Sequence, residues 1–374
     1  MRGKLPSTKN TPSQIFARSK VQYTLLILIV LNAIFGVITL YAASGQQIYP
    51  LVAKQLGHFC LGIPLMYALS FVDLRQLYRY AYPLYILAAG LVVAVALFGY
   101  TAMGATRWLK FGGFGMQPAE PFKLAVILFL ARYFQDMQPG EISKVRTILY
   151  PFTCVLMPTA LIIKQPDLGT GILVLGVMTI MLFVAGVQLW KFISAGFFVC
   201  ALSPIIWSNL RDYQKKRILV FLYPDSDRLN SGYNILQSKI AIGSGGLWGK
   251  GLGQGSQSQL SFLPEHETDF IFACLAEDMG FIGVLALFLV YILIILIGLG
   301  ISINARSTFG KLVAAGIMGM FFIHIFVNIG MVTGILPAVG IPLPLVSYGG
   351  TMVLSMMTGF GLLLSVNRFH GAKI

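Results

Sequence analysis

The sequence predicts an all-α integral membrane protein with about ten transmembrane helices. Of its 374 residues, 57% are hydrophobic and only 11% are charged, and the mean hydropathy is +0.79. A soluble domain carries about 25% charged residues, so a chain with so few charges could not keep a surface of this size in water. Long apolar runs alternate with short polar pieces, as a hydrocarbon core about 30 Å thick requires.

Ten apolar runs are candidate spans, and their even number places both chain ends on one side of the membrane. Basic residues gather near both ends and in loops expected on that side, for example Arg75 with Arg79 and Arg306 with Lys311, which makes that side cytoplasmic. The first run is too long for the core of a signal peptide, so we expect a retained span. The spans are 22–44, 52–71, 81–100, 119–136, 148–164, 168–187, 189–209, 268–301, 309–333 and 345–366.

A single polytopic membrane domain, residues 22–367, is expected between two cytoplasmic tails, 1–21 and 368–374. The large external loop, 210–268, lies between spans seven and eight and contains seven Lys and Arg residues. Long loops escape the positive-inside rule, so these charges indicate an anionic partner and leave the topology unchanged. Within this loop, the Gly-rich stretch 243–255 either lets the backbone approach a ligand closely or forms a flexible re-entrant turn.

A cluster of ionisable residues is the best candidate for chemistry. It lies in FLPEHETDFIF (262–272), where the external loop enters span eight. Asp269 is at the mouth of the span, where loss of water raises the pKa of a carboxylate towards the range of a general base. The alternative is that Asp269 or Thr268 caps the helix. Glu265 belongs to the same cluster.

Two external segments precede spans four and six. Arg107 is suited to the membrane interface, where it could bind a phosphate bidentately. Glu120 and Lys123 are three residues apart on one helical face and can pair, as a structural ion pair or as part of a ligand site. Asp167 follows a proline at the start of span six, where helix capping is the favoured interpretation.

The remaining polar candidates lie in external loops. The loop between spans seven and eight offers amide, hydroxyl and cationic groups that could hold a pyrophosphate and sugar hydroxyls, although each alone resembles ordinary loop surface. They are Gln214, Arg217, Gln237, Ser238 and Lys239. The last external loop, 334–350, is a proline-rich turn in which Ser347 could donate a hydrogen bond.

Several classes of function lack their residues in this sequence. The four histidines are scattered, so no metal-ligand cluster or catalytic dyad is indicated. No GxxxxGK[ST] loop is present, which argues against ATP-driven transport by this chain. The net charge of +14 comes without zinc-finger spacing, a basic helix or an aromatic-basic platform, so no nucleic-acid partner is expected. The four cysteines are far apart in or beside apolar runs, which favours packing roles.

A set of motifs from the third span to the C-terminus resembles a known family. They are QPAEPFK (117–123), QPDLGT (165–170), YQKKR with FLYP (213–224), GYNILQSKIAIGSGGLWGKGLGQGSQSQLSFLPEHETDFIF (232–272) and GILPAVGIPLPLVSYGG (334–350). With them the chain resembles the SEDS family (shape, elongation, division and sporulation proteins), the ten-span glycosyltransferases of peptidoglycan synthesis. GSQSQLSFLPE, GIPLPLVSYGG and the short N-terminal tail resemble the RodA elongation branch more than the FtsW division branch.

Two positions depart from the family pattern. Glu267 stands where the family usually has a histidine before the Thr-Asp pair, and His266 lies one position earlier. Further into span eight, the usual pair of glutamates is Glu277 and Asp278 here. Asp269 itself is in place.

The resemblance implies a peptidoglycan glycosyltransferase that polymerises lipid II at the outer face of the bacterial cytoplasmic (inner) membrane, for cell elongation and rod shape. It implies that Asp269 is the essential carboxylate. It also implies a lipid-facing groove lined or supported by Glu120, Lys123, Asp167, Gln214, Arg217, Gln237 and Ser238. We add as substrate-binding candidates Arg107, Lys239, Glu265, Thr268 and Ser347, and expect no metal ligand.

In the expected mechanism, Asp269 deprotonates the acceptor sugar hydroxyl, which attacks the anomeric carbon of the donor with inversion. Loop cations, Arg217 foremost, stabilise the departing pyrophosphate. No cofactor is certain, although a divalent cation (Mg²⁺ or Mn²⁺) could assist. The expected partners are lipid II, the undecaprenyl-pyrophosphate-linked glycan, membrane lipid and, by resemblance, a class B penicillin-binding protein transpeptidase.

Two rival functions remain open at this point. A lipid II flippase would need essential groups at mid-membrane depth and would tolerate loss of an external carboxylate. A non-catalytic scaffold of the elongation machinery would recruit a transpeptidase and have no activity of its own. The external position of Asp269 favours the polymerase.

Overall fold

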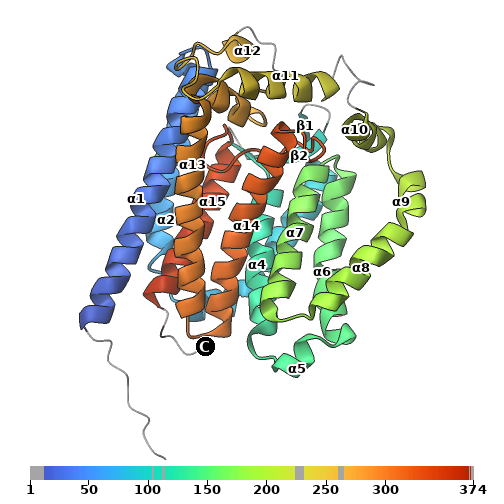
Figure 1. The fold of residues 1–374 in the computed structure, drawn as a ribbon. Coiled ribbons are helices and arrows are strands. Elements are labelled where there is room, and N and C mark those ends of the chain that lie inside the picture. Colours follow the sequence, from blue (N-terminus) through green and yellow to red (C-terminus); the bar gives the residue numbers. More distant parts are fainter. Residues whose placement is uncertain are drawn as a thin grey trace, which may run out of the picture.

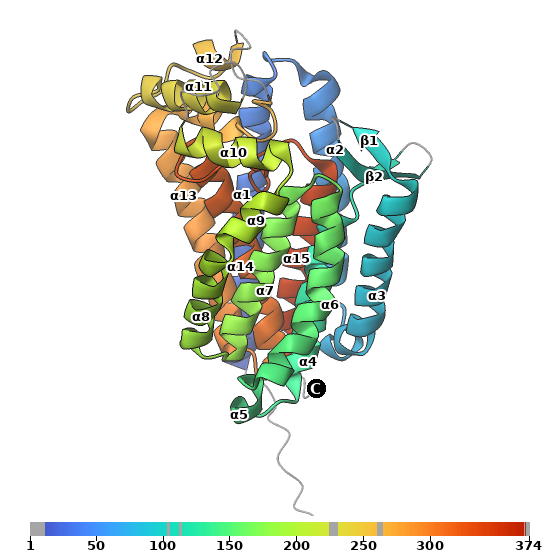
Figure 2. The ribbon, with the colours of Figure 1, turned by 90° about the vertical axis from the view of Figure 1, so that its right-hand side faces the viewer.

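The long helices of the chain stand side by side in one bundle (Figures 1 and 2). The computed structural model describes residues 12–102, 105–111, 114–223, 231–259, 265–369 and 371. Most of the predicted 1–21 tail, the loop residues Arg228 and Pro264, and the end of the 368–374 tail lie outside these described residues.

Each predicted span corresponds to one helix or to one bent pair of helices. Their bounds are α1 (Pro12–Ala43), α2 (Ala53–Leu69), α3 (Leu74–Phe98), α4 (Ala119–Gln135), α6 (Val145–Lys164), α7 (Leu168–Ala185), α8 (Leu189–Ala201) with α9 (Ser203–Asn209), α13 (Ile271–Asn304), α14 (Thr308–Val332) and α15 (Gly350–Arg368). Among the described residues, seven helices are long and apolar enough to cross a membrane, and the pair α8–α9, bent by 51°, would make an eighth span. With 17 residues each, α2 and α4 are shorter, so the total of ten stays a prediction.

The centre of the bundle is formed by α4, α14 and α15, which pack against one another. In α14 and α15, 72% and 78% of the apolar window is buried, against 22% in the peripheral α3. Small residues allow this close approach, as is typical of packed membrane helices. At Gly316, a Cβ would lie 2.5 Å from Sδ of Met181 and 2.7 Å from Cγ2 of Ile127.

The two ends of the bundle differ (Figure 1). One end holds η1 (Ile48–Val52), α10 (Asp212–Leu222), α11 (Ser231–Ser244), α12 (Ser256–Gln259) and the strands β1 (Tyr100–Ala102), β2 (Ala105–Phe111) and β3 (Phe114–Met116). The opposite end holds α5 (Pro139–Ile142), the start of α1 and the end of α15. Both described chain ends therefore lie at one end of the bundle, as the even number of spans predicts.

The structure corrects the sequence prediction in two regions of that first end. The strands form an antiparallel sheet in the order β1-β2-β3, with Tyr100 opposite Trp108 and Leu109 opposite Met116, where no strand was expected. β-branched and aromatic residues such as Thr106 and Trp108 favour this pleated conformation. The expected loop 210–268 is largely helical within its described part, because α10, α11 and α12 occupy it.

Several predicted span boundaries also move. The helices of spans one and three begin earlier than predicted, at Pro12 and at Leu74, where 22 and 81 were expected. Span eight begins at Ile271 and is kinked at Gly280, whose φ of 65° and ψ of −165° interrupt the helix. Glycine adopts positive φ without a Cβ clash, so one apolar run of 34 residues contains two helical segments. Span ten begins at Gly350, and residues 345–349 belong to the preceding loop.

The Gly-rich stretch folds onto the first segment of α13. The backbone amides of Gly253 and Gly255 each donate a hydrogen bond of 3.0 Å to the carboxylate of Asp278. Lys250 forms an ion pair of 2.7 Å with Glu277. At Gly249, with φ of +78°, a Cβ would clash with the carbonyl group of Asp278. The expectation of a flexible turn is therefore wrong, because the stretch is bound to two carboxylates of α13.

Candidate active site

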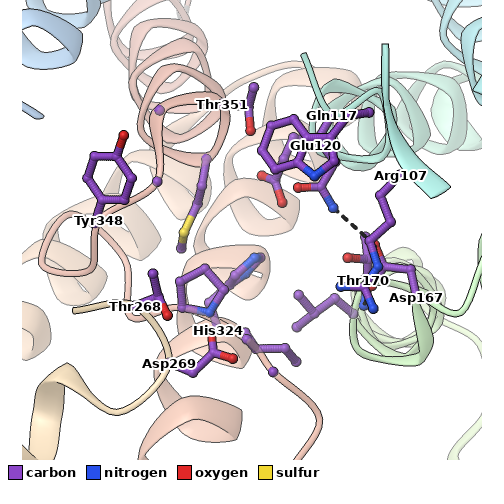
Figure 3. Close-up of a pocket in the computed structure, with 18 of the residues that line it drawn as sticks. Arg107, Gln117, Glu120, Asp167, Thr170, Thr268, Asp269, His324, Tyr348 and Thr351 are labelled. Atoms are coloured by element: carbon purple, nitrogen blue, oxygen red, sulfur yellow. Dashed lines mark hydrogen bonds and ion pairs between the residues drawn. The ribbon is translucent and has the colours of Figure 1, made fainter. Parts of the chain in front are cut away.

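A cavity of about 560 Å³ lies among the helix ends near the sheet. Its walls come from α2, α4, α7, α10, α14, α15, the sheet, the turn before α13 and the loop before α15. Figure 3 shows Asp269 and Thr268 on one side of this cavity and Arg107 and Asp167 on the other. More than half of the predicted site residues line it, namely Arg107, Glu120, Asp167, Arg217, Glu265, Thr268 and Asp269.

The turn 265–270 carries Asp269 into the cavity. The N-cap of α13 is Phe270, and no side chain caps this helix, so the alternative that Asp269 or Thr268 is a helix cap is wrong. Thr268 donates a hydrogen bond of 2.9 Å to Oε2 of Glu265. Its carbonyl oxygen accepts one of 2.5 Å from Oγ of Ser347. The carboxylate of Asp269 is thus left to face the cavity.

The environment of Asp269 suits a proton acceptor. Burial raises the pKa of Asp269 to about 6, and the negative charge of Glu265 also raises it. The guanidinium groups of Arg107 and Arg217 act in the opposite direction on this pKa. A carboxylate with a pKa near the operating pH is both available and sufficiently basic.

Asp167 organises the facing wall. It caps α7 by accepting a hydrogen bond of 3.2 Å from the amide of Thr170, as predicted. Its Oδ2 also accepts one of 3.0 Å from the side-chain amide of Gln117 and lies 3.8 Å from Nε of Arg107. Through another nitrogen of its guanidinium group, Arg107 donates a hydrogen bond to the carbonyl of Pro166. The cap therefore also holds a guanidinium group at the cavity wall.

Arg217 brings a second guanidinium group to the cavity from α10. Its pKa is lowered from the usual value by burial first and then by the positive charge of Arg107, while Asp269 and Asp167 raise it. The two arginines therefore repel each other. A ligand with two or more negative charges would relieve this repulsion and accept charge-assisted hydrogen bonds.

A cluster of ionisable side chains lies deeper in the bundle, below the cavity. Nζ of Lys123 lies 2.8 Å from Oε1 of Glu120 and 2.8 Å from Nε2 of His324, so the predicted pairing is confirmed. Nδ1 of His324 lies 2.7 Å from the carbonyl oxygen of Met320. Glu120 and His324 reach the cavity, whereas Lys123 is fully buried beneath them. Opposite charges in contact reduce the penalty of placing them at this depth.

The remaining predicted residues do not line the cavity, and several make structural contacts. Gln214 caps α10 by accepting a hydrogen bond of 3.0 Å from the amide of Arg211. Ser238 donates one of 2.8 Å to the carbonyl of Val332, which joins α11 to α14. Besides these two and Lys123, the set outside the cavity comprises Gln237, Lys239 and Ser347.

Other lining residues were not selected from the sequence. Gln117 and Tyr348 belong to the quoted motifs, so membership of a motif was the signal that could have found them. Thr170 ends a third motif. His58 and His324 come from α2 and α14, and nothing in the sequence links two histidines so far apart. Among the described residues, no group of three or more His, Cys, Asp and Glu side chains could hold a metal ion.

Comparisons with known proteins agree with this architecture. The profile of the FtsW/RodA/SpoVE family, described as cell cycle protein, matches residues 22–371. The chain is 44% identical over 347 residues to peptidoglycan glycosyltransferase MrdB of Escherichia coli strain K12, which covers 92% of both proteins.

Two solved structures are also similar. One is a chain from a study of how a peptidoglycan synthase complex coordinates polymerization and crosslinking, with 29% identity and a TM-score of 0.81, over 93% of this chain and 98% of that chain. The other is the rod shape determining protein RodA of Thermus thermophilus, with 27% identity and a TM-score of 0.70, over 94% and 98%.

Proposed function

Since the chain belongs to the FtsW/RodA/SpoVE family of cell cycle proteins, we propose that it is a peptidoglycan glycosyltransferase of the RodA branch. It polymerises lipid II into glycan strands for cell elongation and rod shape. The observation that carries this proposal is the half-buried carboxylate of Asp269, which shares one cavity with the guanidinium groups of Arg107 and Arg217. A base and a pair of cations are what glycosyl transfer from a pyrophosphate requires.

Asp269 acts as the general base. It takes the proton from a sugar hydroxyl of the acceptor, and the hydroxyl oxygen forms a bond to the anomeric carbon of the donor chain. The bond from that carbon to the pyrophosphate oxygen breaks, and its electron pair leaves with the lipid pyrophosphate. An α-linked donor thus gives a β-linked product by a single inversion. No covalent enzyme intermediate of the kind formed by retaining glycosidases is needed.

Arg107 and Arg217 receive the charge that develops on the leaving group. Donors that are already oriented towards developing charge lower the barrier, because no reorganisation is needed during the reaction. Asp167 and Gln117 hold this side in place, since Asp167 contacts both Gln117 and Arg107. A divalent cation, Mg²⁺ or Mn²⁺, would supply further positive charge at the same pyrophosphate if it enters with the substrate.

The proposed orientation places the cavity at the outer face of the bacterial cytoplasmic membrane. The cavity lies at the end of the bundle that holds the sheet and α10 to α12, opposite both described chain ends. Charge in the loops predicts those chain ends to be cytoplasmic. We also propose a class B penicillin-binding protein as partner, because the similar chain comes from a complex that couples polymerization to crosslinking.

The second candidate is a lipid II flippase. The buried group of Glu120, Lys123 and His324 favours it, because ionisable residues at membrane depth often mark a transport path. A flippase and a polymerase give different products from the same substrate, so a single reconstitution separates them.

The test uses purified protein, with and without a class B transpeptidase, in vesicles that carry labelled lipid II. The polymerase proposal predicts glycan strands, seen as a ladder after electrophoresis, when the substrate is in the leaflet that faces the cavity. Transfer of intact lipid II between leaflets without any strands would contradict the proposal and support the flippase. Neither strands nor transfer, from folded protein in the presence of the partner, would contradict both.

A further inference from the structure

Asn328 joins the two segments that border Asp269. It is a fully buried residue of α14. Its side-chain nitrogen donates a hydrogen bond of 2.8 Å to the carbonyl oxygen of Asp269 and one of 2.6 Å to the carbonyl oxygen of Ile341. One amide group therefore uses both of its N–H donors on the backbone of the site.

The second segment lies directly against the carboxylate of Asp269. Gly340 precedes Ile341 and has a φ of +74°, and a Cβ at Gly340 would lie 3.1 Å from Oδ2 of Asp269. The position of residues 340–341 thus decides where this carboxylate can lie. By binding Ile341 and Asp269 together, Asn328 fixes that relative position.

Other contacts between the two segments lie further from the carboxylate. Ser347 donates to the carbonyl of Thr268 at 2.5 Å, and the backbone amide of Tyr348 donates to the carbonyl of Glu267 at 3.0 Å. They hold the turn as a whole. Among the described residues, Asn328 is the side chain that hydrogen-bonds the backbone of Asp269 itself.

Burying the polar amide of Asn328 in α14 costs free energy that other interactions must offset. Polar groups without partners destabilise the interior of a membrane protein, and Oδ1 of Asn328 has no hydrogen-bond partner among the described residues. An apolar residue of the same size would avoid that penalty and would leave both carbonyls unbound. The amide is therefore better explained by its two hydrogen bonds to the site than by the packing of α14.

We propose that Asn328 is a positioning residue for glycosyl transfer, which holds the Asp269 carboxylate against Gly340 and directs it into the cavity. This inference rests on the proposed function of Asp269 as the base. Small displacements of a base reduce the chemical step strongly, by up to about 100-fold for 1 Å. Binding of the lipid-linked substrate depends on other groups and should change little.

The test compares Asn328→Leu with Asn32→Leu in strand synthesis from labelled lipid II. Asn32 is a matched control, because it is a fully buried asparagine of α1 whose side chain makes no hydrogen bond to the described residues of 265–270 or 334–349. We expect Asn328→Leu to lower kcat by about 10- to 100-fold with KM changed less than about threefold. We expect Asn32→Leu to keep the wild-type kcat.

The pH profile separates positioning from a loss of folded protein. Without the two hydrogen bonds, Asp269 gains access to water, so its pKa falls from about 6 towards the usual value. The acid limb of kcat then moves to lower pH in Asn328→Leu, whereas less folded protein would reduce the rate equally at every pH. Asn328→Asp keeps the shape of the side chain and, as a neutral carboxylic acid, one hydrogen-bond donor in place of two. Its kcat should therefore lie between those of the wild type and Asn328→Leu.

Two outcomes would overturn the inference. The first is a wild-type kcat and acid limb in Asn328→Leu. The second is the same loss in Asn32→Leu as in Asn328→Leu, with no movement of the acid limb. Asp269→Ala, assayed in parallel, tests the proposed function separately. Full activity of Asp269→Ala would show that Asp269 is not the base. An inactive Asp269→Ala beside an unaffected Asn328→Leu would refute only the positioning role of Asn328.

Discussion

Gly340 lies against Asp269 so closely that a Cβ at position 340 would be 3.1 Å from Oδ2 of the Asp269 carboxylate. The two residues come from loops far apart in the sequence, and the backbone of one forms a wall for the side chain of the other. This contact restricts the carboxylate to orientations that face the cavity.

Gly340→Ala should reduce strand synthesis by displacing Asp269. The added methyl group enters the space of the carboxylate, and the φ of +74° strains any residue with a Cβ. Gly186→Ala is the matched control, because Gly186 has a φ of +106° with nothing within 4 Å of a Cβ. Both variants should lose about 1–2 kcal/mol of stability from the left-handed conformation, but only Gly340→Ala should lose kcat. Equal kcat values in Gly340→Ala and Gly186→Ala would show that the close approach of Gly340 does not position Asp269.

The rate of strand synthesis should depend on the protonation of Asp269. The base is active as the carboxylate, so the rate should be full above the pKa of about 6 and fall about tenfold per pH unit below it. Glu265→Gln removes a negative charge that raises the pKa of Asp269, so the acid limb should move to lower pH. A limb that stays in place, or moves to higher pH, would show that Asp269 is not the titrating base.

Arg217→Gln should lower kcat by about 100-fold, because a cation that meets developing charge has been removed. Arg217→Lys should recover part of the rate, since it keeps the charge and loses the bidentate geometry. Lys216→Gln removes one positive charge from the same helix at a position that does not line the cavity, and it should leave kcat close to wild type. A similar fall in both glutamine variants would indicate a general effect of loop charge.

Lys123→Met should destabilise the protein by about 3–5 kcal/mol, because a buried charge that loses its partner is left uncompensated. Here that charge is the carboxylate of Glu120, which Lys123 contacts at 2.8 Å. The double variant Lys123→Met with Glu120→Gln should recover much of that loss, since neither partner is then charged. Thermal unfolding of the detergent-solubilised protein measures the stability of the double variant and of the single variants Lys123→Met and Glu120→Gln. If the double variant is as unstable as the sum of the two single variants, the ion pair is not what couples these positions.

The long helices of the bundle were predictable because most of the apolar runs have the length of a membrane span. Span seven shows the limit of that signal, since the single run 189–209 forms two helices bent by 51°. The end of the bundle that holds the sheet and α10 to α12 was harder to predict from the sequence. Residues 100–116 have too few positions for strand periodicity to stand out, and Gly280 divides a run that is apolar on both sides.

The site was predicted in part, for a physical reason. Asp269 stands out because an ionisable group at the mouth of a membrane span is costly, and Arg107 because it suits the membrane interface. Arg217 resembles ordinary loop surface and was selected through the family resemblance. The family resemblance drawn from the motifs is confirmed by the family match over residues 22–371. Asn328 lies outside every quoted motif, and its importance comes from a contact with Asp269 that only the folded chain creates. Gly340 belongs to the motif 334–350, but the sequence gives no sign that it lies beside Asp269.

The most direct test of Asp269 as the base is strand synthesis by the purified Asp269→Asn variant with its partner and labelled lipid II. This substitution keeps the size of the side chain and removes its ability to accept a proton. The account predicts that the folded variant still binds lipid II but makes no glycan strands at any pH between about 5 and 9. Strand synthesis at the wild-type rate would contradict it.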